Sequence, residues 1–256
     1  MNHPGAGGTL AGKAAMVTGG SRGIGLAIAR RFARTGAGVS IVGRDEKTLD
    51  EAAASLKALH VDAHGLPADL ADPESCQWVL DRHMERFGRI DILVNNAAAK
   101  PSRKPIMEVP LESFERLFAV NVTAYFILCQ AAARDMRRRG WGRILNVTSS
   151  TGLKARPGMG DYAITKATEV MLTRQLSVEV GQYGITVNAI APTLTRTDFS
   201  QWQWEDEEEK EKVMRMLSIK RLAEPDDVAA LAAFLASDEA GMITGTVIPV
   251  DGGALA

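Results

Sequence analysis

The chain has 256 residues, of which 46% are hydrophobic and 24% are charged. This composition is typical of a globular protein with a substantial core, and it excludes disordered, collagen-like and coiled-coil chains. The 30 Lys and Arg residues nearly balance the 31 Asp and Glu residues, so the net charge of -1 gives no global field that would draw the chain to nucleic acid or to an anionic membrane.

Neither the N-terminus nor the longest apolar stretch predicts a membrane segment. Residues 1–12 lack the basic patch and apolar run of a signal peptide. The apolar stretch 119–133 is interrupted by polar residues and is shorter than the roughly 20 residues that span a bilayer. Cys76 and Cys129 form no CxxC pair, so we expect free thiols in a reducing, cytoplasmic setting.

Short runs rich in β-branched residues alternate with segments of helical spacing along the whole chain. Apolar residues recur at helical spacing after the first run, as in Ile24, Ile28 and Phe32. Unbroken apolar strands that alternate with helices predict one doubly wound α/β domain with a parallel sheet, mostly of seven strands, and helices on both faces. The predicted strands cover residues 14–18, 38–42, 90–95, 143–148, 185–190 and 246–250, with a weaker run around Leu66.

The chain shows no sign of division into several domains. No internal repeat, low-complexity tract or Pro/Gly/Ser-rich linker interrupts it. We therefore expect residues 10–256 to form a single domain and residues 1–9 to be a flexible N-terminus.

The first predicted strand runs into a glycine-rich turn and then into a helix. The turn reads Thr18-Gly19-Gly20-Ser21-Arg22-Gly23-Ile24-Gly25. Glycines let a backbone turn sharply and approach a pyrophosphate, whose charge the free N–H groups and the positive dipole end of the helix would meet. The spacing is GxxxGxG rather than GxGxxG, and a tight strand-to-helix connection is the alternative interpretation. The position of the turn after the first strand favours dinucleotide binding.

The end of the second predicted strand indicates which dinucleotide binds. A carboxylate there would favour a free ribose 2′-hydroxyl, whereas a guanidinium favours a 2′-phosphate through charge-assisted hydrogen bonds. The sequence has Gly43 and then Arg44 at this point, and Arg22 supplies a second cation. We therefore predict NADP(H) as the preferred cofactor, with NAD(H) as the alternative. In the competing interpretation both arginines are solvated and Asp45 caps the next helix.

A possible proton-transfer site follows the fifth predicted strand. Tyr162 and Lys166 lie four residues apart, on one face of a predicted helix, and Ser149 precedes Tyr162 just past the strand. An ammonium beside the phenol would lower its pKa from about 10, and the serine hydroxyl would assist proton transfer. The Tyr–Lys pair alone is a weak signal, because about one chain in eight of this composition would carry one by chance.

The order and spacing of these motifs resemble the short-chain dehydrogenase/reductase family. The resemblance covers nearly the whole chain, from about Leu10 to the C-terminus, and is greatest for the branch of the 3-oxoacyl-carrier-protein reductases. Besides the glycine turn and the Ser, Tyr and Lys residues, it rests on Asn95-Asn96-Ala97, Asn121, Pro192 and Val250-Asp251-Gly252-Gly253.

The resemblance implies a Rossmann-fold oxidoreductase that transfers a hydride between NADP(H) and a carbonyl or secondary alcohol. Tyr162 would donate a proton to the carbonyl oxygen, or remove one from the alcohol. Lys166 would lower the pKa of the phenol and contact the nicotinamide ribose, and Ser149 would orient the carbonyl. Asn121 would hold a water that links the lysine to solvent, or alternatively would only satisfy backbone groups.

The resemblance also implies which residues contact the cofactor. Asp69 and Leu70 would contact the adenine, although Asp69 could instead cap the helix near Pro73. Ala98 and Thr193 depart from the family pattern, because each stands where glycine is usual and adds a Cβ beside the cofactor path. The implied cofactor residues are Gly19, Ser21, Arg22, Gly23, Ile24, Gly25, Arg44, Asp69, Leu70, Asn96, Ala97, Tyr162, Lys166, Pro192, Thr195 and Thr197.

A substrate lid near residues 193–220 is a further implication of the resemblance. Trp202 and Trp204 in this segment indicate an apolar or amphipathic substrate, or alternatively simple packing or an oligomer contact. The charged residues that follow predict a solvated helix face, with Asp206–Lys210 and Glu208–Lys212 as i, i+4 pairs.

The resemblance further implies a homotetramer, formed through two long helices near residues 111–139 and 162–181. We predict no metal site, because His60 and His64 share an i, i+4 spacing but no third ligand is evident.

Two further function hypotheses remain beside an NADP(H)-dependent carbonyl reductase, for which a 3-oxoacyl thioester is a candidate substrate. One is an NAD-dependent dehydrogenase of a sugar, polyol or steroid. The other, from a different class, is a dinucleotide sensor without catalysis. The four filled positions Asn121, Ser149, Tyr162 and Lys166 favour an enzyme.

Overall fold

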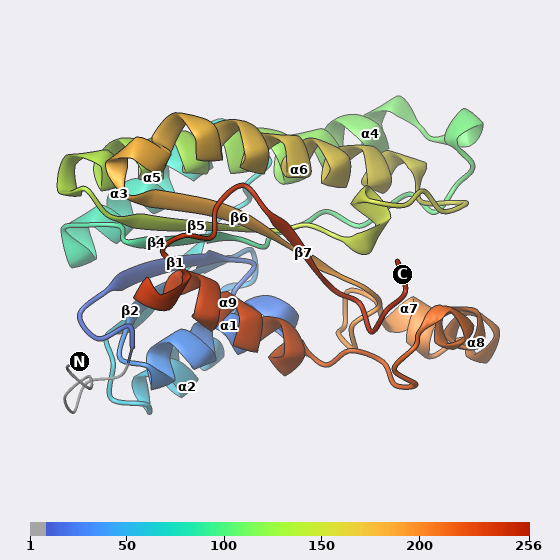
Figure 1. The fold of residues 1–256 in the computed structure, drawn as a ribbon, viewed down its shortest axis with the longest axis horizontal. Helices are drawn as coiled ribbons and strands as arrows, with labels where there is room; N and C mark the ends of the chain where they lie inside the picture. Colours follow the sequence, from blue (N-terminus) through green and yellow to red (C-terminus); the bar gives the residue numbers. More distant parts are fainter. Residues whose placement is uncertain (1–8) are drawn as a thin grey trace.

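Seven parallel strands form one sheet in the order β3-β2-β1-β4-β5-β6-β7 (Figure 1). The computed structural model describes residues 9–256, so the expected flexible N-terminus falls almost entirely outside the described residues. The sheet confirms the predicted Rossmann-type architecture. The strands are β1 (Ala14–Thr18), β2 (Gly38–Gly43), β3 (Ala63–Pro67), β4 (Ile92–Asn95), β5 (Gly142–Val147), β6 (Ile185–Pro192) and β7 (Val247–Val250).

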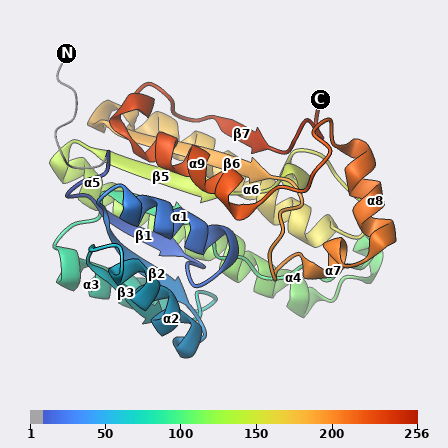
Figure 2. The same cartoon turned by 90° about the horizontal axis from the view of Figure 1, so that it is seen from below.

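Helices cover both faces of the sheet (Figures 1 and 2). One face carries α1 (Gly23–Arg34), α2 (Glu46–Lys57) and α9 (Pro225–Ala236). The other carries α3 (Pro73–Phe87), α4 (Leu111–Phe118), α5 (Ala124–Arg139) and α6 (Gly160–Val180). The two short helices α7 (Gln201–Trp204) and α8 (Glu207–Met216) lie beyond the carboxyl ends of the strands, and residues of α7 border the site described below.

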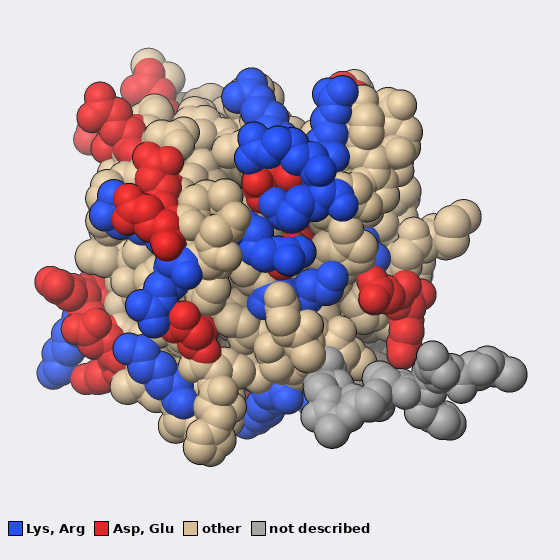
Figure 3. Space-filling model, turned by 90° about the vertical axis from the view of Figure 1, so that its left-hand side faces the viewer, with Lys and Arg blue, Asp and Glu red and all other residues tan. Residues whose placement is uncertain are grey.

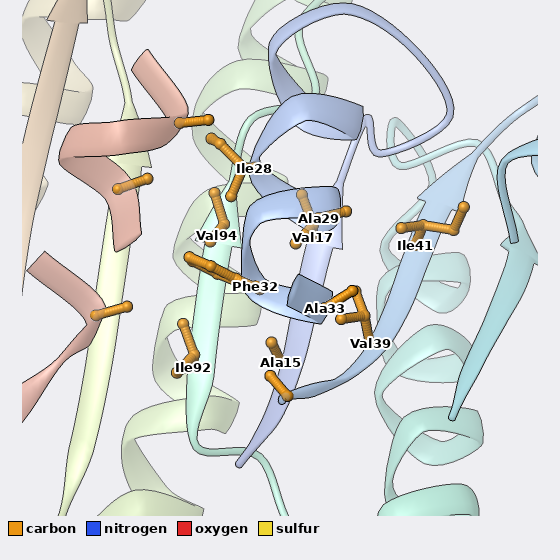
Figure 4. Packing of buried hydrophobic residues seen from close by; sticks show 14 of the residues in the cluster. Ala15, Val17, Ile28, Ala29, Phe32, Ala33, Val39, Ile41, Ile92 and Val94 are labelled. Carbon is orange, nitrogen blue, oxygen red and sulfur yellow. The ribbon is translucent and has the colours of Figure 1, made fainter. Parts of the chain in front are cut away.

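The apolar stripe predicted for α1 packs against the sheet (Figure 4). Ile28 and Phe32 are fully buried, in one cluster with Val17 of β1 and Val94 of β4. Burial of each such large side chain contributes about 1.5–3 kcal/mol to stability. This packing fixes the start of α1 directly behind the end of β1.

Lys and Arg side chains gather at the amino ends of the strands, on the side of the molecule opposite the site (Figure 3). The fully buried Asp91 accepts hydrogen bonds from the Ala14 amide (2.8 Å) and from Arg89. Asp135 pairs with Arg138 and Arg139 in the last turn of α5, where cations also complement the helix dipole. Arg89, Arg138 and Arg139 therefore bind buried carboxylates, and these contacts hold the start of β1 and the end of α5 in place.

The chain from Leu111 to Arg139 forms one continuous helix, which α4 and α5 share through a π-helical turn at Ala119–Thr123. By length and composition alone, this helix is apolar enough to cross a membrane, so the apolar stretch at 119–133 belongs to a longer element than the sequence suggested. Half of its most apolar window is buried inside the protein, where Leu128 and Ala132 pack in the core. Such burial is typical of a core helix of a globular protein.

Candidate active site

A cavity of about 850 Å³ opens at the carboxyl ends of the strands. It lies over the junction of β1 and β4, where the winding direction of the chain reverses and where sheets of this kind bind ligands. Gly25 and Asn121 do not line the cavity. All the other predicted site residues do, namely Gly19, Ser21, Arg22, Gly23, Ile24, Arg44, Asp69, Leu70, Asn96, Ala97, Ser149, Tyr162, Lys166, Pro192, Thr195 and Thr197.

The glycine turn forms the floor of the cavity beside β1. Gly19 has a left-handed backbone (φ +62°), and a Cβ there would lie 2.8 Å from Asn96 Nδ2. Gly25 lies beneath the turn, where a Cβ would collide with the Gly19 carbonyl. Because glycine has no Cβ, α1 can pack closely against the turn.

The N-terminus of α1 is open toward the cavity. Its N-cap residue, Arg22, makes no side-chain capping hydrogen bond, and its first turn contains no acidic residue. By contrast, Asp45 caps α2 and Asp72 caps α3. The first N–H groups of α1 are therefore available to an anionic ligand.

The loops after β1 and β4 are tied together at the same point. The amides of Asn96 and Ala97 donate to Thr18 Oγ1 at 2.9 and 3.0 Å, and Asn96 Nδ2 donates to the Thr18 carbonyl at 2.9 Å. Thr18 is fully buried, so its hydroxyl serves as an internal clamp. Asn96 thus holds the glycine turn as well as lining the cavity.

Arg44 is exposed at the tip of β2 and lines the cavity. Asp45 accepts a hydrogen bond from the Thr48 amide at 2.8 Å, so it caps α2 as the competing interpretation expected, and this cap leaves Arg44 free to line the cavity. Arg22 lies across the mouth of the cavity from Asp198, with 3.7 Å between Nη1 and Oδ2. Both partners are largely exposed, and such pairs contribute little to stability.

Asp69 lines the cavity, where its contact with the adenine stays a prediction, and it also has a partner that neither sequence-based expectation included. The alternative that it caps α3 is wrong, because Asp72 accepts from the Glu74 and Ser75 amides. Asp69 instead forms an ion pair with Arg116 of α4, at 2.7 Å. Arg116 also lines the cavity and was not predicted, since a partner 47 residues away leaves no local pattern.

Ser149, Tyr162 and Lys166 converge on one wall of the cavity. Ser149 follows β5, and its Oγ accepts from the Thr151 amide at 3.1 Å, so it also caps the short turn that follows. Tyr162 lies in the first turn of α6 with 8% of its surface exposed. Lys166 Nζ lies 5.4 Å from the centre of the Tyr162 ring and donates to the Val147 carbonyl at 3.0 Å.

Glu169 is a buried carboxylate beside the lysine that the sequence reasoning missed. Lys166 Nζ contacts its two carboxylate oxygens at 2.8 and 3.0 Å, and both side chains are almost fully buried. Burial raises the pKa of Glu169 to about 7, against the opposing effect of Lys166. Although burial acts to lower the pKa of Lys166, its contact with Glu169 raises it. The i, i+3 spacing from Lys166 was the available sequence signal.

The prediction of a lowered pKa for the Tyr162 phenol is wrong. Burial raises the pKa of Tyr162, the Lys166 ammonium lowers it by less, and the charge of Glu169 adds a further rise. The lysine therefore acts in the predicted direction, but burial outweighs it.

Asn121 lies in the π-helical turn and is fully buried. Its Oδ1 accepts from the Ala99 amide at 2.9 Å, and its Nδ2 donates to Thr165 Oγ1 of α6 at 3.0 Å. The side chain thus joins the loop after β4 to the helix of Tyr162. This confirms that Asn121 satisfies a backbone group, while the water it would hold stays a prediction.

The two departures from the family pattern fit without strain. Neither Ala98 nor Thr193 has a left-handed backbone, and both line the cavity. Thr193 Oγ1 is buried and has no hydrogen-bond partner within residues 9–256. A buried hydroxyl of this kind needs a partner, and a bound ligand would supply one.

These features fit a dinucleotide. The glycine turn admits a pyrophosphate, the open end of α1 offers N–H groups to it, and Thr193 offers a hydroxyl that has no partner in the described part of the chain. The cavity extends from Arg44, at the adenosine end, to Tyr162 and Ser149, at the end where a substrate would react.

The segment 193–220, for which the family resemblance implies a lid, contains α7 and α8. The predicted Asp206–Lys210 pair is wrong, because Asp206 caps α8 and Lys210 pairs with Glu207 at 3.0 Å. The predicted pair of Glu208 with Lys212 is confirmed at 2.9 Å.

The two tryptophans of this segment play different parts. Trp202 lines the cavity, where the guanidinium of Arg103 lies 4.8 Å from its ring centre. Trp204 packs against a small apolar cluster that includes Val213, and its Nε1 donates to the Thr197 carbonyl at 3.0 Å. Trp204 thus meets the expectation of simple packing, while an apolar or amphipathic substrate beside Trp202 stays a prediction.

Comparisons with known proteins agree with this site. Residues 19–254 match the family model described as enoyl-(acyl carrier protein) reductase. A 3α-hydroxysteroid dehydrogenase of Mediterraneibacter gnavus is 38% identical over 96% of this chain and 98% of its own. The human dehydrogenase/reductase SDR family member 4 is 36% identical over 95% of this chain and 88% of its own.

A solved structure gives the same result. The short-chain dehydrogenase from Burkholderia cenocepacia in complex with NADP is 37% identical, covers 97% of this chain and 100% of its own, and superposes with a TM-score of 0.90. The matches extend over nearly the whole sheet and both of its helical layers. The chain therefore belongs to the short-chain dehydrogenase/reductase family and is an NAD(P)-dependent oxidoreductase.

Proposed function

We propose that the protein transfers a hydride between NADP(H) and a carbonyl or secondary alcohol, with Tyr162 as the proton donor or acceptor. One observation carries this proposal: Ser149, Tyr162 and Lys166 line the same cavity as the glycine turn and the open end of α1. A binding module without catalysis would not need these three side chains to converge.

Each residue near the substrate would have a separate role in the reaction. The nicotinamide, when bound, supplies the hydride chemistry. In reduction, the Tyr162 hydroxyl gives its proton to the substrate oxygen, and the Ser149 hydroxyl donates a hydrogen bond that orients this oxygen. The Lys166 ammonium stabilises the resulting phenolate. In alcohol oxidation the same phenolate removes the proton.

Arg44 supports the proposed preference for NADP(H). Replacing it with Ala is expected to raise KM for NADPH by about 10- to 100-fold, because a charge-assisted contact with the 2′-phosphate is lost. KM for NADH should change by less than about threefold, since NADH has no such phosphate. Initial rates with both cofactors measure this, and an equal change in both KM values would contradict the preference.

Different relatives support different candidate substrates. The resemblance to 3-oxoacyl reductases favours a 3-oxoacyl thioester, whereas the 3α-hydroxysteroid dehydrogenase among the relatives supports the steroid alternative. Oxidation of NADPH and of NADH with acetoacetyl thioester is the direct test, followed by a panel of ketones, steroids, sugars and polyols. If the protein turns over none of these compounds with either cofactor, the proposed function is contradicted.

We further propose that the protein forms a tetramer. On α6, Ile164, Met171 and Val178 recur every seven residues and are exposed, Val178 by 76%. A second exposed apolar pair, Phe234 and Met242, lies near α9 and before β7. A tetramer with two-fold axes needs two different self-complementary faces, and we propose the exposed residues of α6 for one of them and Phe234 with Met242, in place of the helix near residues 111–139, for the other.

Changing Met171 and Val178 together to Glu is expected to yield a smaller species, because like charges would face each other across the two-fold axis. Sedimentation velocity measures the change. Met107→Glu is the control, because Met107 is 91% exposed but belongs to neither set. A wild-type monomer, or a double variant of unchanged mass, would refute this assembly.

We also propose that the protein works in a reducing, cytoplasmic setting. Both cysteines are free and buried, and burial raises the pKa of Cys76 to about 11 and that of Cys129 to about 12. Thiols held in this way are inert side chains of the core, for which no oxidising compartment is needed.

A further inference from the structure

An arginine that has no partner among the described residues lines the substrate end of the cavity. Arg156 lies in the loop between the short turn Ser150–Gly152 and α6, and it lines the same cavity as Ser149 and Tyr162. The residue is half-buried. Within residues 9–256, no hydrogen bond or ion pair engages its guanidinium.

The loop holds Arg156 in a defined turn. The Met159 amide donates to the Arg156 carbonyl at 3.3 Å, and Gly158 takes a left-handed backbone conformation (φ +71°) that favours glycine. The backbone of Arg156 is therefore set before any ligand arrives.

The positive charge of Arg156 lacks a close counter-charge. Burial lowers its pKa, and only the charge of Asp251 acts against this effect. Asp251 forms no ion pair with Arg156, and its oxygens accept from the Gly253 and Leu255 amides, each at 3.0 Å. The Arg156 guanidinium nevertheless stays protonated. Its partial burial costs free energy, because the charge loses part of its hydration, unless a nearby anion offsets this loss.

The acidic residues that line the cavity are engaged elsewhere. Asp69 pairs with Arg116 at 2.7 Å, and Asp198 lies 3.7 Å from Arg22. Neither carboxylate is thus the partner of Arg156.

The cofactor phosphates do not account for Arg156 either. Arg44, which faces the adenosine end, follows β2, whereas Arg156 comes after β5. In the strand order these two strands lie three spacings apart, which is roughly 14 Å at about 4.8 Å per spacing. The pyrophosphate site at the start of α1 lies behind β1, also away from β5. An anion at Arg156 therefore lies on the side of the reacting groups Ser149 and Tyr162.

We infer that Arg156 binds an oxyanion of the substrate, so that the substrate is a carbonyl or hydroxy compound that also carries a carboxylate or a phosphate. A guanidinium donates two parallel hydrogen bonds to such a group, which fixes orientation as well as supplying affinity. The inference rests on the proposed function, because it places the substrate beside Tyr162. It narrows the substrate class of that site.

Matched substrate pairs test the inference by kinetics. Acetoacetate is compared with its methyl ester, and dihydroxyacetone phosphate with dihydroxyacetone, so that each pair differs in the anionic group. In Arg156→Gln, kcat/KM for the anionic member is expected to fall by about 10- to 100-fold, and for the neutral member by less than about threefold. The pair that responds tells a carboxylate site from a phosphate site.

Lys154→Gln is the matched control. Lys154 lies in the same loop and carries the same charge, but it is exposed and does not line the cavity. This variant should leave both members of each pair unchanged within about twofold. Equal losses for anionic and neutral substrates in Arg156→Gln, or equal effects of the two variants, would overturn the inference.

A binding measurement separates this inference from the proposed function. Phenylglyoxal modifies arginine side chains, and mass spectrometry of the peptide that contains Arg156 gives its rate of modification in the wild-type protein with NADP⁺. Acetoacetate or dihydroxyacetone phosphate is expected to slow this rate at least about threefold, while the neutral analogues do not. No protection by either anion refutes the oxyanion site even in an active enzyme. Protection without turnover of any carbonyl contradicts the proposed function instead.

Discussion

Replacing Tyr162 with Phe is expected to lower kcat by about 10²- to 10⁴-fold, the usual contribution of a positioned acid or base. The variant loses only the hydroxyl, and the ring still packs near Phe199, whose ring centre lies 6.3 Å away. The glycine turn, α1 and Arg44 stay intact, so the Kd for NADPH should change by less than about twofold. Steady-state rates and fluorescence titration with NADPH measure the two quantities.

Tyr125→Phe is the matched control for this experiment. Tyr125 is fully buried in α5, its ring centre lies 5.5 Å from Lys166 Nζ, and it does not line the cavity. The same hydroxyl deletion should therefore leave kcat within about threefold of the wild-type value, since the Tyr125 hydroxyl makes only a long contact, 3.5 Å, with the Val147 carbonyl. Substantial turnover by Tyr162→Phe, or an equal loss in both variants, would remove Tyr162 from the role of proton donor.

The sheet and the glycine turn could be predicted because their signals are local. β-branched runs mark the strands, and the order of alternating elements decides that the sheet is parallel. Even the weak run around Leu66 became β3, paired with β2. Strand ends were less certain, since β4 begins at Ile92 and β6 extends to Pro192. The spacing of Tyr162 and Lys166 likewise placed both on one helical face.

Several side-chain contacts, both across the fold and within one helical turn, could not be predicted. The Asp69–Arg116 pair joins α4 to the end of β3, and no local pattern distinguishes it from a helix cap. Lys210 had two acidic residues within reach, at i−3 and i−4, and the cap at Asp206 decided between them. The pKa of Tyr162 is raised chiefly by burial, and the extent of that burial depends on how the packed helices and loops enclose the phenol.

Removing the charge of Glu169 is expected to shift the pH dependence of alcohol oxidation toward lower pH. Glu169 contacts Lys166 at 2.8 Å and raises the pKa of Tyr162, because its negative charge disfavours the phenolate. Oxidation needs the phenolate, so its rate rises as pH increases through the pKa of Tyr162. In Glu169→Gln the pKa of Tyr162 falls, because the negative charge of Glu169 no longer offsets the Lys166 ammonium. The rise in oxidation rate therefore occurs at lower pH.

The same substitution should lower stability. It leaves a fully buried ammonium without its counter-charge, and loss of one partner of a buried ion pair costs about 3–5 kcal/mol. The free energy of unfolding, measured in urea, gives this value. Because the variant is less stable, its pH profiles must be measured on the NADP⁺ complex and at a temperature where the variant stays folded.

Two further variants separate the effect on proton transfer from the loss of stability. Glu169→Asp keeps the charge, so its pH profile should stay close to that of the wild type even if the shorter side chain lowers stability. Glu179→Gln carries the same change on an exposed turn of α6 and should alter neither quantity. If Glu169→Gln loses stability and rate but its profile does not move, Glu169 only supports the fold. If the profile moves and Glu169→Asp restores it, Glu169 sets the proton affinity of Tyr162 through Lys166.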